Sequence, residues 1–120
     1  MITPIAVLLL ALPCPAGAQQ VKAKLDCKLT DTDFVYDCRI RLEPPNAGVR
    51  ISVDADMPSM PMAHNTDPVQ AKPTKVPGEY RVQLDLEMPG EWAVKLHLSG
   101  AARGVLVLNY VFPEADDRPR

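Results

Sequence analysis

The chain has 120 residues, a formal net charge of −2 at pH 7 and 47% hydrophobic residues. That length fits a single domain with a hydrophobic core of its own. Proteins that bind nucleic acids or anionic membrane surfaces usually have an excess of basic residues, and the net charge of this chain shows no such excess. We therefore expect no nucleic acid partner.

The N-terminal eighteen residues have the pattern of a secretory signal peptide. An apolar run at residues 5–12 is followed by prolines and by the small residues Ala16-Gly17-Ala18, which predicts cleavage after this string. The run is too short to span a bilayer, and no later segment approaches about twenty apolar residues. We expect residues 1–18 to be removed, residues 19–113 to form the domain, and the protein to be periplasmic or secreted with no membrane span. A lipid anchor through Cys14 is the alternative.

Seven later segments alternate apolar and polar residues, which is typical of β-strands. Their ranges are 20–29, 34–43, 48–57, 68–75, 79–87, 91–98 and 103–112. No segment shows a helical period, and the thirteen prolines would interrupt most helices. The pattern predicts an all-β protein, an immunoglobulin-like antiparallel β-sandwich of about seven strands. A closed barrel is the alternative.

The first two predicted strands agree on one pairing register. In a hairpin that turns at Thr32-Asp33, three pairs face each other on one side of the sheet: Leu25 with Ile40, Cys27 with Cys38, and Leu29 with Tyr36. Facing cysteines in a non-hydrogen-bonded antiparallel pair lie close enough for a disulfide, which persists in an exported protein. The rival interpretation is a thiolate metal or redox site, but ten intervening residues match no common spacing of that kind. We expect a Cys27–Cys38 disulfide.

Two later segments, PGEYRVQLDL at residues 77–86 and PGEWAVKLHL at residues 89–98, resemble each other. Each begins with the Pro-Gly signal of a type II turn and continues as a strand. The predicted inward rows are Tyr80, Val82, Leu84 and Leu86, then Trp92, Val94, Leu96 and Leu98. Trp92 is therefore the predicted core anchor. The strand at 103–112 is apolar on both faces, which leaves its parity open, and residues 114–120 are expected to form a disordered charged tail.

Residues 56–65, DMPSMPMAHN, contain three of the five methionines and one of the two histidines. The two prolines exclude a helix and predict an extended, exposed loop. Side chains at every second position of such a loop can project to one side, and these are Met60, Met62 and His64. Two thioethers and an imidazole suit a soft cation, above all Cu(I).

The alternative role for these methionines is packing, because methionine fills irregular gaps and adaptable binding surfaces. Three further residues are secondary ligand candidates. Met57 also continues the inward row of its strand, and Met88 precedes the second Pro-Gly signal at a place that the sequence does not relate to the loop. His97 has the opposite parity to Trp92, so it is expected to face solvent.

Three motifs together, DMPSMPMAH at 56–64, PGEY at 77–80 and MPGEW at 88–92, resemble the YtkA-like family, which is related to FixH. The resemblance covers roughly residues 49–98. It implies a small exported or membrane-tethered β-sandwich connected with copper handling, in the case of FixH with assembly of a copper-containing oxidase. It also implies that Met60, Met62 and His64 are the positions that matter.

These observations favour an exported copper-binding or copper-delivery accessory protein, with a copper enzyme or transporter of the same compartment as its partner. The alternative is a metal-free interaction domain whose methionine loop docks on another protein. An enzyme is not expected. Two histidines are too few for copper–zinc superoxide dismutase chemistry, a blue-copper centre needs a free thiolate, and no nucleophile or carboxylate-pair motif is present.

Overall fold

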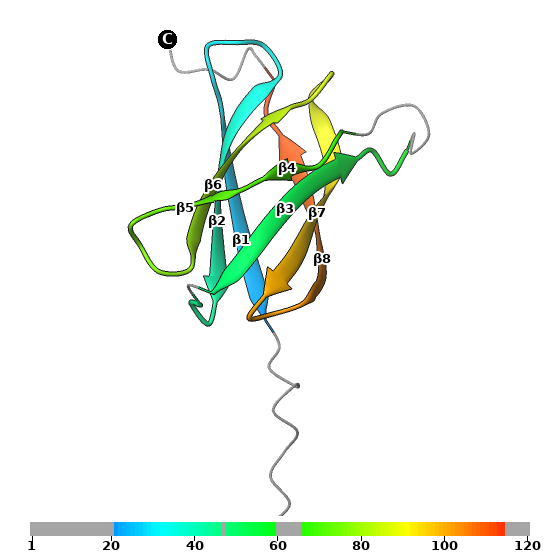
Figure 1. Cartoon of the computed structure of the whole chain (residues 1–120). Helices are drawn as coiled ribbons and strands as arrows, with labels where there is room; N and C mark the ends of the chain where they lie inside the picture. Colours follow the sequence, from blue (N-terminus) through cyan, green and yellow to red (C-terminus); the bar gives the residue numbers. More distant parts are fainter. Residues whose placement is uncertain (1–20, 47, 60–65, 115–120) are drawn as a thin grey trace, which may run out of the picture.

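The alternation of apolar and polar residues produces eight β-strands in the computed structural model, which describes residues 21–46, 48–59 and 66–114. The strands form two antiparallel sheets that pack face to face as a sandwich (Figure 1). The prediction of an all-β sandwich is confirmed. Within the described ranges, no helix has the length and apolar character needed to cross a membrane. The predicted signal peptide, residues 1–18, and the tail after Glu114 lie outside the described residues.

Each sheet has four strands. The first has the order β1-β2-β6-β5, with β1 at Lys22–Leu29, β2 at Val35–Glu43, β6 at Glu79–Asp85 and β5 at Lys72–Pro73. The second has the order β4-β3-β7-β8, with β4 at Val69–Gln70, β3 at Val49–Asp56, β7 at Gly90–Gly100 and β8 at Gly104–Phe112. This division corresponds to the A-B-E-D and C-F-G strands of an immunoglobulin fold, with one strand added beside C.

The segment at 68–75 differs from the single strand that was expected. It forms two short strands, of which β4 pairs with β3 in the second sheet and β5 pairs with β6 in the first. The chain crosses between the sheets at Ala71, which is buried and donates its N–H to Ile51 O. Alternation shows that a segment is extended but not which strand it pairs with, so the crossing could not be predicted from the sequence.

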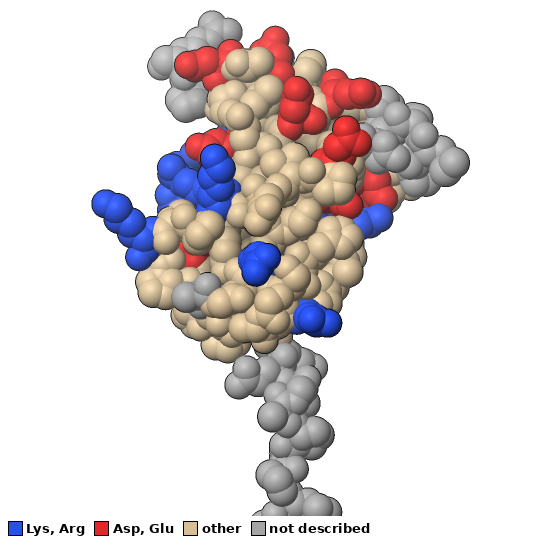
Figure 2. All heavy atoms as spheres, viewed as in Figure 1, with Lys and Arg blue, Asp and Glu red and all other residues tan. Residues whose placement is uncertain are grey.

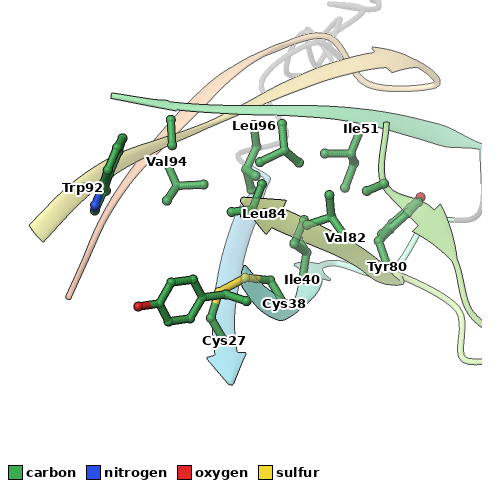
Figure 3. Close-up of a cluster of buried hydrophobic side chains, with 14 of the residues drawn as sticks. Cys27, Cys38, Ile40, Ile51, Tyr80, Val82, Leu84, Trp92, Val94 and Leu96 are labelled. Atoms are coloured by element: carbon green, nitrogen blue, oxygen red, sulfur yellow. A yellow bond between two sulfur atoms is a disulfide. The ribbon is translucent and has the colours of Figure 1, made fainter. Parts of the chain in front are cut away.

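Both predicted inward rows lie in the core between the sheets (Figure 3). Trp92 is 1% exposed, and the other seven residues of the two rows are also buried. The structure also settles the parity of β8. Leu106, Leu108 and Tyr110 pack against the core, Phe112 is buried, and the odd-numbered valines face outward.

The first Pro-Gly signal forms the predicted turn, whereas the second does not. Gly78 has a φ of 77°, and Glu79 N–H donates to Val76 O, as in a type II turn. Gly90 also has a positive φ, 118°, but it is already the first residue of β7 and pairs with Phe112. The second Pro-Gly therefore leads directly into a strand.

The predicted register of the first hairpin is confirmed. Leu25 faces Ile40 and Leu29 faces Tyr36. Between them Cys27 faces Cys38, and the two are joined by a disulfide that is buried in the core (Figure 3).

Tyr110 joins the two sheets beside this disulfide. Its hydroxyl accepts a hydrogen bond from Cys27 N–H at 2.9 Å and donates one to Cys27 O at 3.3 Å. Cys27 lies on β1, an edge strand of the first sheet, whereas Tyr110 lies on β8 of the second. One side chain therefore satisfies a donor and an acceptor on an edge of β1 that pairs with no other strand of the described residues.

Replacing Tyr110 by phenylalanine keeps the ring but leaves the part-buried Cys27 N–H without this acceptor. We expect the free energy of unfolding to fall by about 0.5–1.5 kcal/mol, the net contribution of a typical intramolecular hydrogen bond. Urea denaturation of the wild type and the variant measures the difference. Equal stabilities would mean that water replaces the hydroxyl and that the bond contributes nothing.

Candidate functional site

The methionine-rich segment begins and ends at one point of the fold. Met60, Met62 and His64 lie outside the described residues, but the residues on either side of them are placed. Thr66 N–H donates to Ala55 O at 2.9 Å, and Ala55 N–H donates to Thr66 Oγ1 at 2.9 Å. These two hydrogen bonds, the Ala55–Thr66 bridge, fix both ends of the segment at the end of β3.

Two further methionines lie at the same end of the sandwich. Met57 is 8% exposed and packs in the core, as its parity predicted. A Cβ atom at Gly90 would lie 3.8 Å from Met57 Cε, so Met57 reaches the start of β7. Met88 is half-buried in the turn before β7, where its carbonyl oxygen accepts a hydrogen bond from Trp92 Nε1 at 3.1 Å. Figure 1 shows the β6–β7 turn and the end of β3 at the same end of the molecule.

This end also has an acidic groove. The groove has a volume of about 370 Å³, and the buried side chains of Trp92 and Leu84 form its floor. Asp67, Asp85 and Glu87 line it, and none of its lining residues in the described part of the chain is a lysine or an arginine. Figure 2 shows acidic side chains gathered toward this end, with lysines and arginines farther down. The local charge therefore favours cations.

His97 lies elsewhere, on the outer face of the second sheet. It faces Ser52 in the middle of β3, and its ring Nε2 lies 3.1 Å from Asp54 Oδ2. Its side chain is 42% exposed, which confirms the predicted orientation toward solvent. The structure brings Met57 and Met88 to the same end of the sandwich but does not bring His97 to them.

A second charged pair lies beside this histidine. Lys95 Nζ donates a hydrogen bond to Asp56 Oδ2 at 2.9 Å. That bond and the negative charge of the carboxylate raise the pKa of Lys95. Asp54 and Asp56 of β3 thus each have a partner on β7, His97 and Lys95.

No group of three or more His, Cys, Asp or Glu side chains suited to a metal ion occurs in the part of the chain that the structure describes. Both cysteines of the domain are used in the disulfide. The prediction of a soft-metal site therefore depends on the thioethers and the imidazole of residues 60–64.

Sequence reasoning missed the acidic groove. Its carboxylates come from three separate places in the chain, after the methionine segment, at the end of β6 and in the β6–β7 turn. Only the pairing of the strands brings them together. The methionine segment at residues 56–65 and the Pro-Gly signal at residues 89–90 are the sequence features that lie next to these carboxylates.

Comparison with known proteins gives one family. A family model described as YtkA-like matches residues 41–97, a range that extends from β2 to β7 and includes the Ala55–Thr66 bridge and all the candidate ligands. No curated protein and no solved structure matches the chain.

Proposed function

With residues 41–97 assigned to the YtkA-like family, we propose that the protein is an exported copper-binding or copper-delivery accessory protein. Its Cu(I) ligands are Met60, Met62 and His64. The observation that carries the proposal is the Ala55–Thr66 bridge, which fixes both ends of the ligand segment at the end of β3. We also propose that the protein is related to FixH and that its partner is a copper enzyme or transporter.

The donor set favours Cu(I) by its chemistry. Thioether sulfur is a soft ligand that suits Cu(I), whereas Zn(II) prefers thiolate, imidazole and carboxylate. Thioethers have no proton to lose, so mild acidity weakens such a site less than it weakens an all-histidine site. The carboxylates of the neighbouring groove add a negative potential that raises the local concentration of cations.

The fixed ends of the segment lower the entropic cost of ligation. A segment whose ends are already joined has lost part of its conformational freedom before the metal binds. Ligation then bears less of the entropic cost of closing the segment into a loop. The disulfide supports the exported location, because disulfides form and persist in oxidising compartments.

Replacing Met60 and Met62 together with leucine tests the proposal. Leucine keeps most of the apolar bulk and removes both sulfurs, so the thermal midpoint should stay unchanged. We expect the Cu(I) affinity, measured by titration against a competing chelator, to fall at least tenfold, or about 1.4 kcal/mol. Wild type should bind one Cu(I) and discriminate strongly against Zn(II).

Met57→Leu is the matched control, because it removes a thioether that is buried in the core. It should leave the Cu(I) affinity unchanged. Equal Cu(I) binding by the wild type and the double variant would show that Met60 and Met62 are not ligands. If the wild type binds no Cu(I), the metal-free docking domain is the better description.

A further inference from the structure

The outer face of the first sheet has a cluster of cationic side chains at its centre. The pairing of β2 with β6 places Arg39 directly opposite Arg81, and the pairing of β5 with β6 places Lys72 on the other side of Arg81. Arg41, the next outward residue of β2, adds a further cation. These four residues, Arg39, Arg41, Lys72 and Arg81, are called the cationic patch below. Figure 2 shows lysines and arginines gathered over the area where Figure 1 places β5 and β6.

The cationic patch is poorly neutralised within the protein. Among the described residues, Arg41, Arg81 and Lys72 take part in no ion pair. Like charges that lie directly opposite each other on neighbouring strands destabilise a sheet. The row formed by Arg39, Arg81 and Lys72 therefore opposes folding, and an arrangement of this kind is expected where a function requires it.

A buried glutamate holds one of these arginines in place. Arg39 Nε lies 3.0 Å from Glu79 Oε1, and Glu79 is the only buried charged residue in the part of the chain that the structure describes. The side chain of Arg39 is 42% exposed, and this ion pair is made through Nε. Its two Nη groups are thus left to form the planar fork with which arginine binds a carboxylate at two points.

We propose that the cationic patch is a docking surface for an acidic segment of another protein. The carboxylates of that segment accept hydrogen bonds from Arg39 and Arg81. Hollows of about 430 and 380 Å³ flank the two arginines, the first lined by Lys72 and Arg81 and the second by Arg39 and Arg41. They provide room for side chains of the segment on either side. The proposal does not rest on Cu(I) binding, because the patch lies on the first sheet and the methionine segment begins at the end of β3 in the second.

The carboxylates among these cations favour a protein over a nucleic acid or a membrane. Asp26 faces Arg39 from β1, and Asp37 lines the same hollow as Lys72 and Arg81. A phosphate backbone or an anionic bilayer would bring negative charge against both aspartates. A protein can instead place a cation opposite each aspartate and a carboxylate opposite each arginine. The net charge of −2 also disfavours a polyanion as the partner.

Three double variants of the full chain, purified as the cell exports it, test the proposal. Arg39→Gln with Arg81→Gln removes two cations of the patch, whereas Arg39→Lys with Arg81→Lys keeps both charges and removes both forks. Arg50→Gln with Arg103→Gln is the matched control, because it removes two exposed arginines outside the first sheet. Fluorescence anisotropy of a fluorescein-labelled hexaglutamate peptide at low salt measures the dissociation constant. Thermal midpoints show whether each variant is folded.

We expect the wild type to bind the peptide and the glutamine variant of the patch to raise the dissociation constant at least about tenfold. The lysine variant should raise it about threefold, because lysine has no planar fork. The control should stay within about twofold of the wild type. Equal losses in the two glutamine variants, with none in the lysine variant, would show attraction by net charge alone and would overturn the proposal. A wild type that does not bind hexaglutamate would also overturn it, as would tighter binding of an oligodeoxythymidylate of equal charge.

Discussion

Replacing Trp92 by alanine is expected to lower the free energy of unfolding by about 3–5 kcal/mol, as other deletions of large buried aromatic side chains do. Trp92 is 1% exposed and lies in the core between the sheets (Figure 3). The substitution leaves a cavity there and also removes the hydrogen bond from Trp92 Nε1 to Met88 O. The midpoint and slope of a urea denaturation curve give the change.

Trp92→Phe separates the two contributions, because it keeps most of the apolar volume and removes only the N–H donor. It should cost clearly less than the alanine variant. Val76→Ala, at an exposed valine, is the control and should change the stability by less than about 0.5 kcal/mol. A loss below about 1 kcal/mol for Trp92→Ala would contradict the assignment of Trp92 as the core anchor.

Removal of the disulfide should have the second-largest effect. The free energy of unfolding of the variant with Cys27→Ala and Cys38→Ala is expected to be about 3 kcal/mol lower than that of the wild type. The cross-link closes a short loop, with a sequence separation of 11, and so restricts the unfolded chain. Loss of two buried sulfurs from the core adds to this effect.

The chemical state of the two cysteines is checked on the exported wild type. Alkylation under denaturing conditions without reductant should add no label, and alkylation after reduction should add one label to each cysteine. Labelling of both cysteines without reductant would show that the bond is absent, and would reopen a thiolate metal site at Cys27 and Cys38.

The parts of the fold that could be predicted from the sequence are those in which the alternation of apolar and polar residues allows only one strand register or one inward face. The register of the first hairpin is an example, because Leu25, Cys27 and Leu29 all find apolar partners in the same alignment. The inward rows that begin at Tyr80 and Trp92 are a second example. In each case burial of one face decides the parity of the strand.

Prediction failed where tertiary contacts decide. The alternation in residues 68–75 does not show that the chain leaves one sheet at Ala71 and joins the other. The apolar residues on both faces of β8 left its parity open until its packing against the core was known. At the candidate site, the sequence could not relate Met88 to the methionine segment, because their proximity arises from the pairing of β3 with β7.

The Ala55–Thr66 bridge has a consequence for how this protein can diversify. Two hydrogen bonds close the base of the segment independently of what lies between its ends. Insertions, deletions and substitutions after the buried Met57, within residues 58–65, are therefore expected to leave the strands paired, since the cost of closing a loop grows slowly with its length. The sandwich should in this respect accept a transplanted recognition sequence of another specificity between Met57 and Thr66 while the rest of the domain stays folded.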